Sequence, residues 1–199
     1  MSVLSRRSAT ADARRATEQA LLDATVALLE EGRAFAEISI EQIVRGAGVS
    51  RPTFYSYFRD KRALILELGE GVRQALIQSA DPWLDLVDDD VEHSLAALLR
   101  TYQRYASTVR ALMEAATYDE EVAAFWRVLH DGFLPRVEQR ILASVPDIPD
   151  DQAHARAYSL VWMTERVLSE HTARPTVTES ALLRQLAWVW TTSTSDIST

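Results

Sequence analysis

Residues 43–64 read IVRGAGVSRPTFYSYFRDKRAL, and their pattern predicts the architecture of the N-terminal part of the chain. Apolar residues recur at helical spacing on both sides of the segment Ala47-Gly48-Val49, which predicts two short helices joined by a tight turn. Ser50 is a favourable N-cap for the second helix, and Pro52 is tolerated in its first turn because the missing N–H has no helical partner there. Such a pair forms a helix-turn-helix, and its second helix is narrow enough to enter the major groove of DNA.

The second helix of this pair carries residue types that suit contact with DNA. Phe54 and Phe58 lie four residues apart and are expected to anchor the helix in the core. Arg51, Thr53 and Tyr55 then face outward together, which disfavours the alternative of a helix-turn-helix used only as scaffold. Arg51 can donate two hydrogen bonds to guanine, and Thr53 can offer its hydroxyl or methyl group to a base edge. Hydroxyl groups suited to phosphate contacts are those of Tyr55, Ser56 and Tyr57.

The helix expected near residues 12–31 and the two helices of the pair make a three-helix domain. Ser39 and Gln42 have the spacing of a capping box, so a helix is expected to begin at Ser39. Lys61 lies beside the N-terminus of the helix that follows, where it adds positive charge to a natural phosphate site. Residues 1–62 therefore form the predicted DNA-binding domain with a basic N-terminal arm, and residues 63–199 form a larger helical body.

The whole chain is predicted to be all-α, because apolar residues recur at helical spacing throughout and no stretch alternates in the manner of β-strands. The sequence predicts about nine helices, near residues 12–31, 39–46, 50–57, 60–79, 90–106, 108–117, 119–144, 151–172 and 177–194. Pro135 predicts a kink inside segment 119–144. Asp81-Pro82 and Asp88 to Asp90 are expected to interrupt the helices, and residues 195–199 are expected to fray.

Composition and charge limit the class of protein. The net charge of -8 divides unevenly, since residues 1–62 carry +2 and residues 63–199 carry -10, so only the first segment suits a nucleic-acid partner. The chain has no cysteine and no apolar run approaching the roughly 18 residues of a membrane span, which predicts a soluble cytoplasmic protein without disulfides. The four histidines lack metal-ligand spacing, and no phosphate loop, nucleophile elbow or HExxH motif occurs, so we expect no enzyme, no cofactor and no metal.

Residues 43–64 closely resemble the DNA-binding signature of the tetracycline-repressor (TetR/AcrR) family of transcription regulators, and the resemblance extends from the first helix to Leu64. The base-reading positions that the resemblance implies are Arg51, Pro52, Thr53 and Tyr55. The positions that it implies for holding the DNA backbone are Ser39, Ser56, Tyr57 and Lys61, and the helix-capping Ser50 completes the set of DNA-binding candidates.

Sequence pieces farther along the chain are similar to one branch of this family. The branch that these pieces resemble most is that of the mycobacterial ethionamide-resistance repressors. The pieces are RPTFYSYF, the preceding AEISIEQI, WMTER at 162–166 and VWTTS at 189–193. The resemblance implies a repressor that binds palindromic or pseudo-palindromic operator DNA as a homodimer and is released by an apolar small-molecule effector. Such a dimer would hold its recognition helices about one DNA turn, roughly 34 to 36 Å, apart, and effector binding would widen that spacing.

The body is rich in aromatic residues, because all five tryptophans lie after residue 82. So many rings are hard to pack without gaps, although core filling accounts for any single ring. Trp126, Leu129 and Phe133 share one helical face, which favours an apolar chamber. The residues expected to surround it are Tyr102, Trp126, Leu129, Phe133, Trp162 and Trp190. By resemblance, Tyr102, Trp126, Phe133 and Trp190 line the chamber, and Thr164 replaces an asparagine that anchors polar ligand groups, so ligand preference should differ.

The last two predicted helices indicate a partner chain. The final helix has two neighbouring apolar stripes, formed by Leu182, Leu186 and Val189 and by Leu183 and Trp190. A helix that is apolar on two sides favours burial against a second subunit. The family resemblance implies a four-helix dimer interface from segments 151–172 and 177–194, and two helices buried within a monomer are the alternative.

Regulation has competing interpretations at this stage. Gly69 and Gly71 lie in the helix that links the chamber to the DNA-binding domain, and each weakens helix formation by about 1 kcal/mol relative to alanine. Either the helix bends at these two glycines, or it simply tolerates them without bending. One alternative to a small-molecule effector is control by a protein partner. This alternative is favoured if side chains fill the interior of the body and leave no chamber. A small helical enzyme is the reading with least support.

Overall fold

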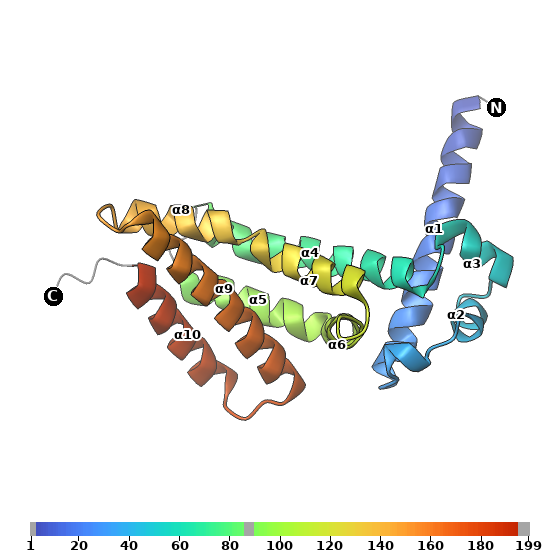
Figure 1. Ribbon diagram of the computed structural model, residues 1–199. Helices are drawn as coiled ribbons and strands as arrows, with labels where there is room; N and C mark the ends of the chain where they lie inside the picture. Colours follow the sequence, from blue (N-terminus) through green and yellow to red (C-terminus); the bar gives the residue numbers. More distant parts are fainter. Residues whose placement is uncertain (1–2, 86–89, 195–199) are drawn as a thin grey trace.

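The computed structural model describes residues 3–85 and 90–194, with side chains from residue 11 onward. All regular structure in these ranges is helical, which confirms the predicted all-α fold. A small head contains α1 (Val3–Glu30), the 3-10 turn η1 (Phe35–Glu37), α2 (Ile40–Gly46) and α3 (Arg51–Tyr57). In Figure 1, α1 stands across one end of an elongated body, and α3 lies at the outer edge of the head.

The body consists of α4 (Lys61–Leu84), α5 (Val91–Arg104), α6 (Ala106–Ala115), α7 (Glu120–Asp131), α8 (Leu134–Ser144), α9 (Asp150–Ala173) and α10 (Glu179–Thr194). The long helix α4 starts at the head and runs along the body, so it belongs to both parts (Figure 1). The helices α8, α9 and α10 lie toward the end of the body that is remote from the head (Figure 1).

Local capping and one glycine turn build the helix-turn-helix. The expected capping box is present at α2, where Gln42 N donates to Ser39 Oγ at 3.3 Å and Ser39 N donates to Gln42 Oε1 at 2.8 Å. Gly48 has a φ of 68° between α2 and α3, a left-handed conformation that costs a residue with a Cβ about 1–2 kcal/mol. Ser50 Oγ then accepts from Thr53 N at 3.2 Å, which fixes the start of α3.

Apolar side chains hold the three head helices together. Phe54 of α3 is fully buried and Phe58 nearly so, as their four-residue spacing predicts. Both belong to one core with Ile43 and Val44 of α2 and Leu21 of α1. Each such side chain stabilises the fold by about 1.5–3 kcal/mol through its removal from water. Because α3 is anchored on one face, its opposite face is left for contacts outside the head.

Two helix boundaries differ from the sequence-based expectation. α1 begins at Val3 rather than near Asp12. α4 continues through Pro82 to Leu84. The proline removes one helical bond, the one that its N–H would make to the Gln78 carbonyl oxygen, and the buried side chains of Trp83 and Leu84 hold the last turn against the core.

The expected kinked helix over 119–144 is two helices, α7 and α8. α7 ends before Gly132, and Pro135 lies in the first turn of α8, where its missing N–H costs no helical bond. The proline therefore starts a helix instead of bending one. Asp90 caps α5 through a 3.1 Å bond from His93 N, whereas the breaks expected at 88–89 and the fraying at 195–199 lie outside the described residues.

Side chains of α6 fasten the head to the body. Glu114 accepts from the backbone N–H groups of Phe35 and Ala36, each at 3.1 Å. Arg110, one turn earlier, donates to the Leu29 carbonyl oxygen at 2.6 Å. These bonds satisfy backbone groups at the end of α1 and in η1 that lie outside regular helical pairing.

Ion pairs between α4 and α7 make a second attachment. Arg62 donates to Asp119 at 2.5 Å and to Glu121 at 3.0 Å. Arg59, just before α4, donates to Glu121 at 3.0 Å. The start of α7 is therefore tied to the residues that follow α3.

Close packing of α4 against α7 requires a glycine at position 69. A Cβ at Gly69 would lie 2.6 Å from Phe125 Cε1 and 3.2 Å from Leu112 Cδ2. Gly71 is different, because a Cβ there would have no neighbour within 4 Å. Gly69 thus permits the close approach of two helices, whereas Gly71 is a tolerated glycine.

We expect Gly69→Ala and Gly71→Ala to change stability in opposite directions. Alanine at 71 removes the helix penalty of glycine and should raise the free energy of unfolding by about 1 kcal/mol. Alanine at 69 gains the same amount but displaces the Phe125 ring, and overpacking of this kind costs about 1–3 kcal/mol. Urea unfolding of both variants measures the difference, and equal stabilisation by both would contradict the packing role of Gly69.

Candidate nucleic-acid interface and ligand cavity

The outer face of α3 presents the side chains expected to contact DNA. The exposed members of this set are Ser50, Arg51, Pro52, Tyr55 and Ser56, and the half-buried ones are Ser39, Thr53 and Tyr57. Arg14 of α1 lies over the Tyr57 ring, 5.5 Å from its centroid, so the ring is braced from within the head. The structure thus brings these residues to the surface, and their contacts with bases and phosphates remain predictions.

Arg51 is held by two neighbours at the surface. Its guanidinium pairs with Glu41 of α2, and Nη2 donates to Tyr55 Oη at 3.1 Å. The hydrogen bond with Tyr55 and the negative charge of Glu41 both raise the pKa of Arg51, so the side chain stays charged. Because both ion-pair partners are exposed, the pair adds little stability, and a guanine can replace Glu41 as the partner of Arg51.

The serine hydroxyls differ in what they can offer to a phosphate. Ser50 Oγ and Thr53 Oγ1 lie 2.8 Å apart, and Ser56 Oγ donates to the Thr53 carbonyl oxygen at 2.7 Å. Ser39 Oγ accepts from Gln42 N, which leaves its own proton available for donation. Ser39 therefore fits the expected phosphate contact better than Ser56, whose proton is used within α3.

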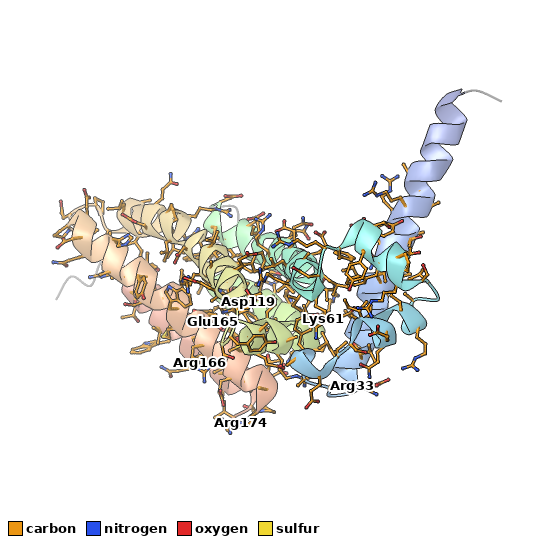
Figure 2. The ribbon with its side chains drawn as sticks, turned by 45° about the vertical axis from the view of Figure 1, so that its right-hand side comes forward. Arg33, Lys61, Asp119, Glu165, Arg166 and Arg174 are labelled. Atoms are coloured by element: carbon orange, nitrogen blue, oxygen red, sulfur yellow. The ribbon has the colours of Figure 1, made fainter. Side chains whose placement is uncertain are left out.

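Lys61 has a structural role in place of the expected phosphate contact. Its ammonium donates to the carbonyl oxygens of Phe35 at 2.8 Å and Ala36 at 3.2 Å, and to that of Ile38. Burial lowers the pKa of Lys61, although the charge of Glu114 opposes this shift. In Figure 2, Lys61 lies where α4 meets the head. The ammonium group bonds to three carbonyl oxygens near η1 and so does not face solvent, where it could meet a phosphate. The position of Lys61 along the sequence of α4 does not reveal these bonds.

Arg51→Ala should relax base preference. Loss of the guanidinium removes a two-bond contact to guanine, so discrimination against a duplex with that guanine replaced should fall by roughly tenfold or more. Competition binding at constant salt measures the ratio, because phosphate contacts vary with salt. Arg33→Ala is a matched control, since Arg33 pairs with Glu31 before α2. An unchanged preference in Arg51→Ala would remove Arg51 from the reading surface.

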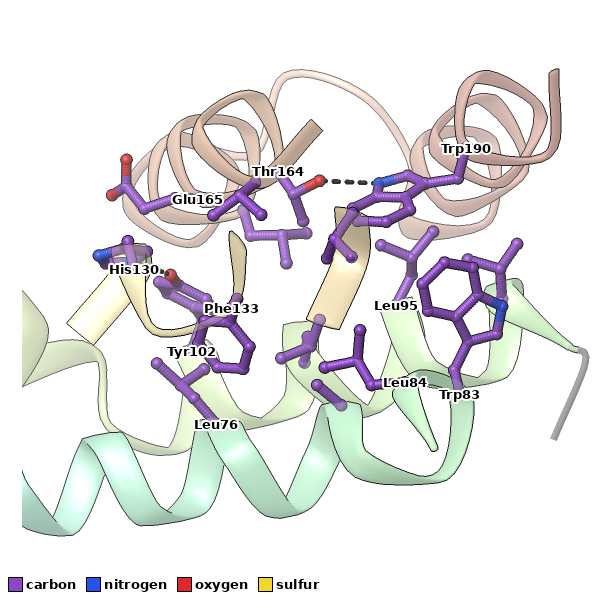
Figure 3. Close-up of a pocket in the computed structure, with 16 residues that line it drawn as sticks. Leu76, Trp83, Leu84, Leu95, Tyr102, His130, Phe133, Thr164, Glu165 and Trp190 are labelled. Carbon is purple, nitrogen blue, oxygen red and sulfur yellow. Dashed lines mark hydrogen bonds between the residues drawn. The ribbon is translucent and has the colours of Figure 1, made fainter. Parts of the chain in front are cut away.

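A small cavity of about 70 Å³ lies in the body, between α4, α5, α7, α8, α9 and α10 (Figure 3). Its walls are aliphatic and aromatic apart from four polar side chains, those of Tyr102, His130, Thr164 and Glu165. Of the residues expected to surround a chamber, those in its wall are Tyr102, Phe133, Thr164 and Trp190. The space is smaller than the roughly 300–1,000 Å³ of typical ligand sites, so a ligand of ordinary size must expand it.

The expectation that Trp126, Leu129 and Trp162 line this cavity is wrong. The His130 ring lies 4.7 Å from the Trp126 ring and 5.1 Å from the Trp162 ring, so the two tryptophans flank His130 while His130 itself reaches the cavity. Leu129 is buried in the core away from the lining. Spacing along α7 defines a face of the helix but not which side chain on that face borders an empty space.

Sequence reasoning named four of the sixteen cavity residues, and those that it missed include Trp83, His130 and Glu165. Trp83 follows a proline that was expected to end the helix, which hid it. His130 lies four residues after Trp126 and shares its helical face, so the signal was present. Glu165 lies four residues after the buried Val161 and therefore shares its helical face. A lone carboxylate on an apolar helical face was the signal in the sequence that could have marked Glu165 as a buried residue.

Thr164 has a partner within the cavity wall. Trp190 Nε1 donates to Thr164 Oγ1 at 2.9 Å (Figure 3). A buried indole N–H without an acceptor costs about 1–3 kcal/mol, so the threonine stabilises the position of the tryptophan. Trp83 packs edge-on against Trp190 with ring centroids 5.2 Å apart, which fixes this corner of the cavity.

The polar ends of Tyr102, His130 and Glu165 gather at the other end of the cavity (Figure 3). His130 Nδ1 lies 2.8 Å from the Trp126 carbonyl oxygen, so this nitrogen carries the proton and donates. His130 Nε2 is then an acceptor, and Tyr102 Oη donates to it at 3.3 Å. Burial lowers the pKa of His130 to about 4, so the imidazole is neutral at pH 7.

Acid should destabilise the protein through His130. Because its folded pKa of about 4 lies below the ordinary 6.5, the neutral ring stabilises the fold fully above pH 6.5, and this contribution is lost as pH falls through about 4. The difference corresponds to about 3 kcal/mol. His130→Gln does not titrate and should show a shallower acid dependence in urea unfolding between pH 6.5 and 4. Identical slopes for parent and variant would contradict this assignment.

A helix-turn-helix head joined to a helical body with an internal cavity defines a class of DNA-binding transcriptional regulators. Residues 21–68 match the family described as bacterial regulatory proteins, tetR family. Residues 91–195 match the C-terminal domain of the transcriptional regulator EthR. The chain therefore belongs to the TetR family and carries an EthR-type C-terminal domain, as the sequence resemblance predicted. Members of this family are regulators that bind operator DNA, not enzymes.

Relatives with assigned names extend the match over most of the chain. The HTH-type transcriptional regulator EthR of Mycobacterium tuberculosis H37Rv is 31% identical over 189 residues, which span 85% of this chain and 83% of the relative. The regulator of the same name from Mycolicibacterium smegmatis is 32% identical over 191 residues, covering 88% and 85% of the two chains.

Solved structures support the fold. A TetR-family regulator from Syntrophomonas wolfei superposes with a TM-score of 0.70 at 18% identity, covering 92% of this chain and 97% of that one. A transcriptional regulator from Aquifex aeolicus gives a TM-score of 0.67 at 18% identity, covering 86% and 96%. In the part of this chain that the structure describes, no helix is long and apolar enough to span a membrane, and no group of three or more His, Cys, Asp or Glu side chains is arranged to hold a metal.

Proposed function

We propose that this regulator is a ligand-responsive repressor, which binds operator DNA as a homodimer and is released by an apolar small molecule. It would act in the cytoplasm, where its operator lies. Residues 1–62 would serve DNA binding and residues 63–199 effector binding and dimerisation, with α4 continuous across that boundary. The DNA contacts proposed for the head are those of Ser39, Ser50, Arg51, Pro52, Thr53, Tyr55, Ser56 and Tyr57.

The observation that carries this proposal is the course of α4. Its first residues, Lys61 and Arg62, hold η1 and the start of α7. Its last turns place Leu76, Trp83 and Leu84 in the cavity wall. One rigid helix thus runs from the cavity to the attachment of the head, so a ligand that displaces the end of α4 shifts the position of α3.

The small cavity volume favours a population shift as the mechanism. A ligand larger than about 70 Å³ binds only a conformation in which the walls have moved apart, and it therefore favours that conformation by its differential affinity. Phe133 lies at the break between α7 and α8, where no continuous helix fixes it, and it lines the cavity. Movement there would pull on α7, whose other end pairs with Arg62.

The outer faces of α9 and α10 support a homodimer. Trp188 of α10 is 62% exposed and Tyr158 of α9 is 53% exposed, although both are large aromatic side chains. Met163 and Val189 line a groove of about 360 Å³ between these helices. Leu186, by contrast, is buried within the subunit. Exposed aromatic surface beside an apolar groove is typical of a protein interface, and a second copy would cover it.

The proposal is tested by DNA binding in the presence of apolar compounds. Footprinting on the DNA that flanks its own gene should give a two-fold symmetric, salt-sensitive site. An apolar compound that raises the melting temperature of the protein should lower its affinity for that site, because the two ligands favour different conformations. A salt-sensitive site that no stabilising compound weakens would favour control by a protein partner, and absence of any preferred site would overturn the proposal.

Trp188→Glu is the variant that tests dimerisation within the same experiment. A carboxylate at this exposed position should split the dimer in sedimentation equilibrium while the subunit stays folded. DNA affinity should then fall steeply, since one half-site contact is lost. Val128→Glu, at a neutral position on α7 that is 68% exposed, is the control for the added charge. A Trp188→Glu protein that still sediments as a dimer would contradict the α9–α10 interface.

A further inference from the structure

We infer that the effector is an apolar molecule with a basic amine, whose ammonium group pairs with the Glu165 carboxylate at the polar end of the cavity. The inference rests on the proposed function and names the ligand chemistry of that site. It follows from which hydrogen-bonding groups at this end already have partners and which do not.

Glu165 is a buried carboxylate with no direct ion pair among the described residues, and the more distant charge of Arg166, which pairs with Glu170, only partly offsets its burial. Its side chain lines the cavity, and the residue is only 7% exposed, so solvent cannot compensate the charge. Ser169 Oγ donates to Oε1 at 3.0 Å. Among the described residues, no Lys, Arg or His nitrogen lies within 4.0 Å of the Glu165 carboxylate. An isolated buried carboxylate is strongly unfavourable, and burial accordingly raises the pKa of Glu165.

The neighbouring polar groups cannot supply the missing partner. The proton on His130 Nδ1 is donated to the Trp126 carbonyl oxygen, and Tyr102 Oη donates its proton to His130 Nε2. The donors at this end of the cavity are therefore used, and the groups that can still form hydrogen bonds are acceptors, mainly the carboxylate oxygens of Glu165. An ammonium group brings three donors and a positive charge, which is the complement of this arrangement.

The rest of the cavity selects an apolar body for the same ligand. The rest of the wall includes the aliphatic side chains of Leu76, Leu84, Leu95, Val161 and Leu168, and Thr164 is engaged by Trp190. A second charge on the ligand would lie among these aliphatic side chains without a partner, at a high desolvation cost. The expected class is therefore an alkyl or aryl monoamine, as opposed to a polyamine or a carboxylic acid.

A groove beside the polar end, whose charged lining side chains are two arginines and two glutamates, gives the ammonium group a way in. Tyr102 lines both the cavity and an open groove of about 540 Å³ between α6 and α9. Ser169, the partner of Glu165, lines this groove as well. Rotation of the Tyr102 side chain would join the two spaces, which provides room for a ligand larger than the closed cavity and leaves its charged end near water.

Two probes of the same skeleton test the inference, 4-phenylbutylamine and 4-phenylbutanol. The dimer should bind the amine at least tenfold more tightly than the alcohol at pH 7, measured by calorimetry and by the shift in melting temperature. Glu165→Gln should bring this ratio close to one, because the amide keeps an acceptor for Ser169 but removes the charge. It should melt no lower than the parent, since an unpaired buried charge has been removed, so failure to fold is not expected to obscure the result.

Glu138→Gln is the matched control, because Glu138 pairs with His154 on α8 and α9 and lies outside the cavity wall. It should keep the parent ratio of amine to alcohol binding. Equal binding of the two probes by the parent, or an unchanged ratio in Glu165→Gln, would overturn the inference while leaving a small-molecule chamber in place. Binding of neither probe, with an intact salt-sensitive DNA site, would overturn both the inference and the small-molecule part of the proposed function.

Discussion

The Glu114 carboxylate holds the backbone N–H groups of Phe35 and Ala36, and much of the structure depends on this contact. The carbonyl oxygens of the same two residues are held by Lys61 from the other side. η1 is thus fixed by α6 through its donors and by α4 through its acceptors. Because α2 and α3 follow directly from η1, the direction in which Arg51 points is set by two helices of the body.

In the proposed mechanism, this double attachment links the cavity to the distant DNA-binding surface. α4 carries cavity residues at one end and Lys61 at the other. α7 carries His130 near the cavity at one end, and at the other its N-terminal acidic residues pair with Arg62. Gly69 keeps the two helices in close contact between these ends. In that mechanism, a change in cavity size would act on two packed helices that both reach the head.

Charge is used differently in the two parts of the molecule. At the surface of α3, the Arg51–Glu41 pair is exposed and easily exchanged for a nucleic-acid partner. In the cavity wall, Glu165 is buried with one hydroxyl donor, and its charge has no equivalent partner. The first arrangement suits a side chain that must change partners on binding DNA. The second suits a group whose partner arrives with a ligand.

Local sequence patterns predict the all-helical fold, the capping box at Ser39, the glycine turn at Gly48 and the outward face of α3, because capping, turns and helical periodicity depend on residues a few positions apart. The packing of distant segments makes Lys61 turn toward the carbonyl oxygens of η1 and makes Glu165, and not Trp162, line the cavity. Those outcomes depend on which side chain fills the space between helices distant in sequence, and the periodicity of one helix carries no information about its neighbours.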